Sequence, residues 1–207
     1  SAFRASGVEK GDRIAICGRN SSRWGMAFWA VLTYGAVAVP ILHEFHPSQV
    51  ADIVAHSEAK VFFVDAMIWP KLDAAAFASV GAVISLKDYS LNMGVTLTAM
   101  PDKVEGITPD DVHYHRDDAE EMAILNYTSG TTSNSKGVMI PYRAIWSNYD
   151  FAVTVLGMEM HPGDRVLSML PMAHMYGMAF EFLFESLYGC HVTFLPKNAS
   201  PTIFLTA

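Results

Sequence analysis

The sequence predicts an α/β fold in which a mostly parallel sheet carries helices on both faces. Short apolar runs alternate with amphipathic segments of about ten residues along the 207-residue chain, which is the pattern of strands joined by crossover helices. One run, VFFV at residues 61–64, is wholly apolar, as expected for a strand covered on both faces. Apolar residues make up 51% of the chain, which suffices for a buried core.

The first portion of the predicted fold covers residues 1–85. We expect strands at 13–17, 37–40, 60–64 and 82–85, and helices at 23–34, 46–56 and 69–78. Ser21 or Ser22 can cap the first helix, and Gly35 can end it. Pro47 suits the first turn of the second helix.

An uncharged run from Trp24 to Leu42 has the length that usually indicates a membrane span of roughly 18 apolar residues. Gly35 divides it, however, and Val37 to Pro40 has the β-branched character of a buried strand. We therefore interpret the run as helix, turn and strand, and predict no transmembrane segment.

The second portion covers residues 119–207. Before it, residues 86–118 lack clear periodicity and gather Pro, Gly and acids, so we expect a linker or surface excursion there. We then expect strands at 122–125, 138–140, 165–169 and 191–195, and helices at 141–156 and 178–187. Pro141 supports the start of the longer helix.

Composition excludes several classes of partner. The net charge is −7 and no Lys/Arg cluster occurs, which argues against nucleic acid as a partner and favours a small molecule. Two cysteines, Cys17 and Cys190, make neither a disulfide framework nor a zinc site, so a reducing cytoplasm is expected. Peripheral membrane contact and oligomeric state are left open.

No metal site is predicted. His113 and His115 would share one face of an extended segment, but spacing marks no third ligand, and neighbouring acids favour a solvated loop. His43 and His46 are three apart rather than the four that a zinc-protease helix requires.

Two polar loops follow predicted strands, YTSGTTSNSKG at 127–137 and LPMAHMYG at 170–177. Ligands bind beyond the carboxyl ends of strands in open parallel sheets, so the two loops are candidates for one site. The first offers hydroxyls, a close backbone approach and a cation, which together suit a triphosphate; these come from Thr128, Ser129, Gly130, Thr131, Thr132 and Lys136.

Two better-known loops are excluded by spacing. A Walker loop needs Gly before its Lys and Ser or Thr after it, whereas Ser135 precedes Lys136 and Gly137 follows. A nucleophile elbow needs Gly two residues before the Ser, but Tyr127 holds that place before Ser129. A serine hydrolase using Ser129 and His174 would rest on residue types alone.

The motif YTSGTTSNSKGV resembles the phosphate-binding motif of the adenylate-forming superfamily of acyl-CoA synthetases, adenylation domains and luciferases, usually YTSGTTGxPKG. Residues 11–41 and LSMLPMAHMYG at 167–177 agree with the same family in order and spacing, and the last is most like long-chain fatty acyl-CoA synthetases. Ser133 and Ser135 depart from the usual Gly and Pro, which predicts a less rigid loop.

The resemblance implies ATP-dependent activation of a long-chain fatty acid to an acyl-adenylate and then, with coenzyme A, to a thioester, with Mg²⁺ on the triphosphate. It places Thr128 to Thr132 and Lys136 on the phosphates, and His174, with Met175, Tyr176 and Gly177, beside the carboxylate. It also implies that residues 1–207 are a fragment of a large N-terminal domain, without the small C-terminal domain and inactive alone.

Alternatives remain open at this stage. A non-catalytic nucleotide-binding or regulatory module, or an enzyme that adenylates an aryl or amino acid, would also carry the phosphate loop. His174 also suits an apolar core. A set of Met and Phe side chains suits either an acyl tunnel or an ordinary core: Met169, Met172, Met175, Met178, Phe180, Phe182 and Phe184.

Overall fold

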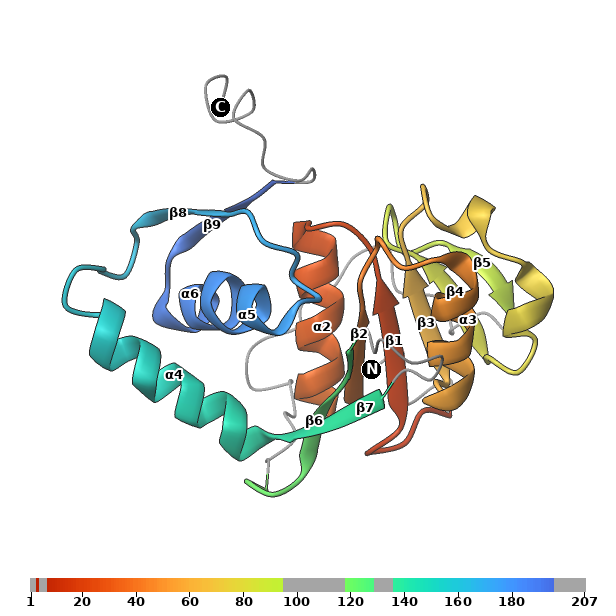
Figure 1. Ribbon diagram of the computed structural model, residues 1–207, viewed down its shortest axis with the longest axis horizontal. Helices are drawn as coiled ribbons and strands as arrows, with labels where there is room; N and C mark the ends of the chain where they lie inside the picture. The colour runs from red at the N-terminus through yellow and green to blue at the C-terminus, as the bar shows by residue number, and fades with distance from the viewer. Residues whose placement is uncertain (1–2, 4–6, 95–117, 129–135, 196–207) are drawn as a thin grey trace, which may run out of the picture.

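The computed structural model describes residues 3, 7–94, 118–128 and 136–195. It contains a seven-stranded sheet with helices on both faces and, beside it, a smaller unit with a two-stranded sheet (Figure 1). The predicted α/β class is confirmed. Within the described ranges no helix is both long and apolar enough to cross a membrane.

The large sheet has five parallel strands in its centre and an antiparallel strand at each edge. In spatial order its strands are β5 (Leu91–Gly94), β4 (Ala82–Ser85), β3 (Val61–Val64), β1 (Arg13–Cys17), β2 (Val37–Ile41), β6 (Met122–Thr128) and β7 (Lys136–Pro141). Ala15 lies between Val39 of β2 and Phe62 of β3 in the register. β1 is therefore a fully internal strand.

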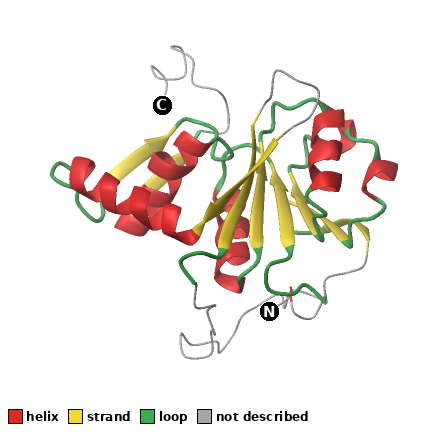
Figure 2. Ribbon diagram, turned by 60° about the horizontal axis from the view of Figure 1, so that its bottom comes forward, coloured by secondary structure: helices red, strands yellow, loops and turns green. Residues whose placement is uncertain are grey.

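Alternate residues of the central strands feed two separate cores, one on each face. Ile14 and Ile16 share a core with Trp24 and Phe28 of α2 (Ser22–Tyr34). Ala15 and Cys17 pack on the opposite face, in the core that includes Val50 and Ile53 of α3 (Pro47–His56). Figure 2 shows the two helical layers with the strands between them. Burial on both faces explains why these strands are uniformly apolar.

The first helix begins and ends as its sequence predicts. The Ser21 hydroxyl accepts from the Trp24 amide at 3.1 Å, which satisfies one of the free donors of the first turn. Gly35 ends α2 with φ of 87°, a left-handed conformation that favours glycine. The uncharged run from Trp24 to Leu42 is thus mostly α2, a turn and β2.

The smaller unit contains α4 (Tyr142–Leu156), β8 (Arg165–Ser168), α5 (Met175–Met178), the π-helical turn η4 (Ala179–Leu183), α6 (Phe184–Tyr188) and β9 (His191–Phe194). β8 and β9 pair in parallel. Phe182 joins this unit to the large sheet, because its ring packs edge-on against Trp24 and Phe28 of α2, with centroids 5.9 and 5.6 Å away.

Several expected elements differ in the structure. The helix expected at 69–78 is two 3-10 turns, η1 (Trp69–Lys71) and η2 (Ala74–Phe77), because the Asp73 side chain accepts from the Ala75 amide and starts a new turn. Part of the expected linker at 86–118 forms β5, an edge strand whose side chains are mostly exposed. Residues 95–117, including His113 and His115, lie outside the described residues.

Two further boundaries shift. The strand expected at 122–125 continues to Thr128, since β7 pairs with it as a hairpin. The last helix starts at Met175 rather than at residue 178, because the His174 ring accepts from the Tyr176 amide at 3.3 Å and caps it.

Phe182→Ala should destabilise the chain by about 3–5 kcal/mol, because it removes a buried ring from the contact between the two units. Urea unfolding measures this loss. Phe151→Ala is the matched control: Phe151 is 57% exposed on α4, so its loss should change stability by about 0.5 kcal/mol or less. Equal losses in the two variants would contradict the packing described here.

Candidate functional site

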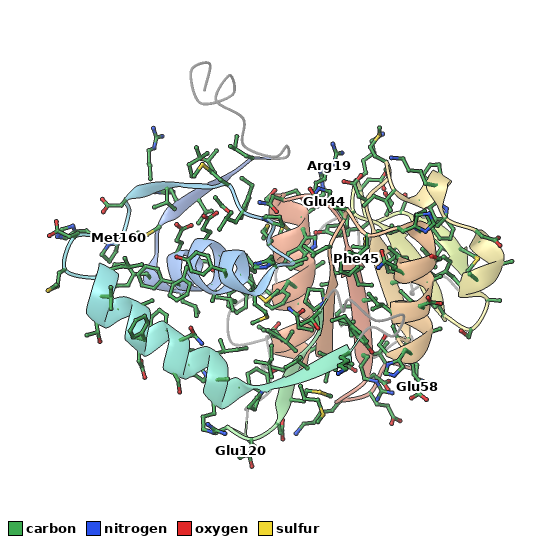
Figure 3. All side chains as sticks on the ribbon, in the orientation of Figure 1. Arg19, Glu44, Phe45, Glu58, Glu120 and Met160 are labelled. Carbon is green, nitrogen blue, oxygen red and sulfur yellow. The ribbon has the colours of Figure 1, made fainter. Side chains whose placement is uncertain are left out.

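The carboxyl ends of β1 and β2 lie together at one edge of the large sheet. The two strands run parallel and in register, so Cys17 and Ile41 end at this edge. Figure 3 shows the polarity of the sheet: Arg19 and Glu44, which follow β1 and β2, lie at one end, and Glu58 and Glu120 lie at the other. We call the end that contains Arg19 the carboxyl edge.

The phosphate-loop candidate leaves from the hairpin of β6 and β7. Thr128 ends β6, Lys136 begins β7, and the two residues pair across the hairpin. Both side chains are exposed. Ser129, Gly130, Thr131 and Thr132 lie outside the described residues, as do Ser133 and Ser135. The hairpin therefore holds a hydroxyl and an ammonium side by side where the loop begins and ends.

Tyr127 anchors the start of this loop on the α3 face of the sheet. It is 4% exposed and packs in the core beneath α3. Its hydroxyl lies 2.7 Å from Nδ1 of His56, the last residue of α3, and the two rings meet edge to face. Burial raises the pKa of the Tyr127 phenol above its ordinary value, so the hydroxyl keeps its proton, and the His56 tautomer sets which of the two groups donates.

The second loop reaches the carboxyl edge on the α2 face, at Asn20. Asn20, three residues beyond the end of β1, is 7% exposed. Its Nδ2 donates to the Leu170 carbonyl at 2.7 Å, and its Oδ1 accepts from the Met172 amide at 2.8 Å. The Tyr127 side chain reaches His56, two residues before Glu58 at the opposite end of the sheet, so the two loops are anchored toward different ends. That they bind one ligand stays a prediction.

The second loop exposes three consecutive side chains between residues that are buried. Met172, Ala173, Gly177 and Met178 are buried. Between them the chain exposes His174, Met175 and Tyr176. A Cβ at Gly177 would lie 2.5 Å from the Pro171 carbonyl oxygen, so only glycine lets the loop close on itself. His174 is therefore a surface side chain on a fixed support, and the alternative of a core histidine is wrong.

The Met and Phe side chains divide between the two earlier interpretations. Met172, Met178, Phe182 and Phe184 are at most 2% exposed and belong to the core. Met175 is 36% exposed, and Phe180 is half-buried beside the exposed Tyr176 ring. With Met169, which is also partly buried, these side chains remain available to line a binding surface.

Two carboxylates near this loop had no role in the sequence interpretation. Glu181 Oε2 accepts from the amides of Met169 and Leu170, at 2.6 and 2.7 Å. Glu185, one helical turn later, is 7% exposed, and burial together with the nearby Glu181 charge raises its pKa to about 7. The sequence signal that could have identified Glu181 and Glu185 is the presence of two acids in the otherwise apolar run AFEFLFESLY.

Arg19 and Asp65 form an ion pair at the carboxyl edge, with Arg19 Nε 3.0 Å from Asp65 Oδ2. Burial alone would raise the pKa of Asp65, but hydrogen bonds from Arg19 and from the Met67 amide hold that pKa below its ordinary value. This ion pair joins the segment that follows β1 to the segment that follows β3. In the described part of the chain, no group of three or more His, Cys, Asp or Glu side chains could hold a metal ion.

Comparison with known proteins settles the family. Residues 1–207, the whole chain, match the family described as AMP-binding enzyme. The chain belongs to this adenylate-forming family. The resemblance on which the phosphate-loop interpretation rests is therefore confirmed. Because the related proteins are ligases, the alternative of a non-catalytic module is not favoured.

Relatives of the AMP-binding chain differ in their substrates. It is 28% identical to Long chain acyl-CoA synthetase 1 of Arabidopsis thaliana, over 84% of this chain and 28% of that protein. It is 27% identical to Sulfoacetate--CoA ligase of Cupriavidus necator, over 98% of this chain and 38% of that protein. The chain thus spans well under half the length of these two relatives.

Among solved structures, the chain is similar to the N-terminal domain of FACL13 from Mycobacterium tuberculosis in its inhibitor-bound crystal structure. The TM-score is 0.77 at 26% identity, and the match covers 99% of this chain and 50% of that one. The fold is therefore that of the N-terminal domain of adenylate-forming enzymes.

Glu185→Gln should flatten the dependence of stability on pH. The Glu185 pKa is raised in the folded state from 4.5 to about 7, so between these values the folded chain binds more protons than the unfolded chain. The free energy of unfolding therefore falls as pH rises through this window. At pH 8 the variant should be more stable than the parent by on the order of 1 kcal/mol, allowing for partial solvent screening, and near pH 4.5 the two should agree.

Thermal melts from pH 4.5 to 8 measure this difference, with Glu159→Gln as the control because Glu159 is exposed just beyond α4. If Glu159→Gln and Glu185→Gln gave the same pH profile, the buried carboxyl would not be the cause.

Proposed function

We propose that this chain supplies the phosphate-binding and carboxylate-binding loops of a ligase that converts a long-chain fatty acid to an acyl-adenylate and then to acyl-CoA. The proposal is supported chiefly by the family match together with the exposed Lys136 and His174 in the two motifs. An acyl-adenylate requires both a phosphate-binding and a carboxylate-binding group, because the carboxylate must approach the α-phosphate of ATP.

In this proposal the hairpin between β6 and β7 binds the phosphates of ATP. Lys136 supplies a charge-assisted contact, and Thr128 supplies a hydroxyl. Ser129, Gly130, Thr131 and Thr132 complete the loop with hydroxyls and with backbone amides that glycine lets a phosphate approach. The hydrogen bond between Tyr127 and His56 holds the end of β6 to α3.

His174 serves the reaction at the second loop. Its Nδ1 accepts from the Tyr176 amide, so the ring carries its proton on Nε2 when neutral and donates from there. We propose that this donor, with the exposed Met175 and Tyr176 and the close-packed Gly177, positions the substrate carboxylate for attack on the α-phosphate. Proton transfer is not required of His174, because a carboxylate is already ionised at neutral pH.

Mg²⁺ would reach the site bound to ATP. Since no cluster of three metal-ligating side chains lies in the described part, this region fits a metal held mainly by phosphate oxygens, with the Thr128 hydroxyl as a candidate protein ligand. When bound, Mg²⁺ would neutralise charge on the triphosphate. Coenzyme A would act as the second substrate.

The name of the Arabidopsis relative supports a long-chain fatty acid as the substrate. The Cupriavidus relative, named for sulfoacetate, keeps a different carboxylic acid as the second candidate. We further propose that residues 1–207 form part of an N-terminal domain, with 1–85, 86–118 and 119–207 as its successive portions, and that turnover requires a separate C-terminal domain. A cytoplasmic location is proposed on the absence of a disulfide between Cys17 and Cys190.

Acid-dependent exchange of pyrophosphate into ATP tests the reaction and its substrate in the complete protein. Long-chain fatty acids should support exchange, whereas aryl acids, amino acids and sulfoacetate should not. Exchange with one of those acids and none with fatty acids would show that the substrate class is wrong, and exchange with no acid would count against ligase activity.

Lys136→Ala should weaken ATP binding by about 10- to 100-fold, because a charge-assisted contact worth about 1.5–3 kcal/mol is lost. Calorimetric titration with ATP and Mg²⁺ measures this effect. Lys71→Ala, which removes an exposed charge from η1, outside both motifs, should leave affinity unchanged. Equal affinity for ATP in both variants would show that Lys136 is only a solvated surface charge.

A further inference from the structure

The side chain of Asn20 bridges two regions of the chain that are 150 residues apart in sequence. It extends from the segment after β1, at the start of α2, to the backbone of the second loop. The amide makes both of its bonds to that one loop, donating to Leu170 and accepting from Met172. Asn20 therefore acts like a short piece of strand to which the loop is paired.

An amide is suited to this contact because it has a donor and an acceptor in one plane. The Met172 side chain is 1% exposed, and its amide bonds to the Asn20 oxygen in a buried setting. Without that oxygen, the N–H group would be a buried donor lacking its partner, and the loop would move to regain one. An aspartate keeps the shape and the acceptor but removes the donor that faces the Leu170 carbonyl.

A second contact holds the loop from the other side. Glu181 accepts from the amides of Met169 and Leu170, and thus fixes the start of the loop to η4 of the smaller unit. Asn20 holds the next residues to the large sheet. Residues 169–172 are therefore joined to both units, and His174 follows two residues later. His174 Nδ1 is itself engaged by the Tyr176 amide, so the ring direction follows the backbone of the loop.

We propose that Asn20 is a positioning residue that sets the place of His174 relative to the phosphate loop. The expected effect on adenylation rests on the proposed function, whereas the anchoring of the loop by Asn20 does not. Asn20 follows β1, and the phosphate hairpin contains β6 of the same seven-stranded sheet. The His174 loop is thereby fixed to the sheet that also carries the hairpin.

The first test uses Asn20→Asp and measures backbone hydrogen exchange in the 207-residue chain. Exchange at residues 170–174 should become at least about tenfold faster, while exchange in β7 and α4 should match the parent. Asn148→Asp makes the same chemical change at an exposed position of α4, where the amide bonds only within its own helix, to the Ala144 carbonyl. This control should leave the loop unchanged.

The second test measures pyrophosphate exchange in the complete protein. Asn20→Asp should lower kcat/KM for the carboxylic acid by about 10- to 100-fold and leave the dissociation constant for ATP within about twofold. A purely structural defect would weaken both substrates together. If Asn20→Asp melts well below the parent, Asn20→Ser, which can still offer a donor and an acceptor, is measured at low temperature instead.

The outcomes separate the two proposals. Unchanged exchange at residues 170–174 overturns the anchor, whatever the activity. Faster exchange with an unaltered kcat/KM overturns the positioning role. Faster exchange with equal losses for acid and ATP overturns it as well. If the parent protein adenylates no acid, the proposed function fails, and the hydrogen-exchange result alone then decides whether Asn20 anchors the loop.

Discussion

Burial of β1 and β2 on both faces is the constraint on which the rest of the structure depends. Alternate side chains such as Ile14 and Ala15 enter opposite cores, so α2 must cover one face and α3 the other. Crossover helices make the strands parallel, and parallel strands bring their carboxyl ends to one edge. The large sheet thus positions the β6–β7 hairpin and the segment after β1, whereas the second loop follows β8 of the smaller sheet and is held to the large sheet by Asn20.

The two loops are fixed to the large sheet by different contacts. Tyr127 enters the core under α3 and bonds to His56, whereas the loop with His174 is bonded by Asn20 beside α2. The loops therefore attach to opposite faces of the sheet. Such an arrangement lets each bind its own part of a large ligand, and it makes their relative position depend on packed, buried groups rather than on the exposed side chains themselves.

Much of this fold could be predicted from local signals. The apolar run VFFV and the caps at Ser21 and Gly35 gave β3 and α2 nearly to the residue, since these signals act over a few positions. The pairing of β8 with β9 outside the main sheet was not predictable, because a short apolar run does not specify its partner. Likewise β5 is held by its edge position, and its exposed side chains carry no period.

The candidate site likewise contains residues that local motifs predict and residues that they do not. Thr128, Lys136 and His174 stand in motifs that can be recognised along the chain, but Asn20 and His56 act across 150 and 71 residues, and no spacing rule connects them to the loops. The central claim is that both loops bind one acyl-adenylate. Hydrogen exchange of the complete protein with a hydrolysis-resistant acyl-adenylate tests it most directly. The account predicts protection at residues 128–136 and at 170–177 together, and protection of one loop without the other would contradict it.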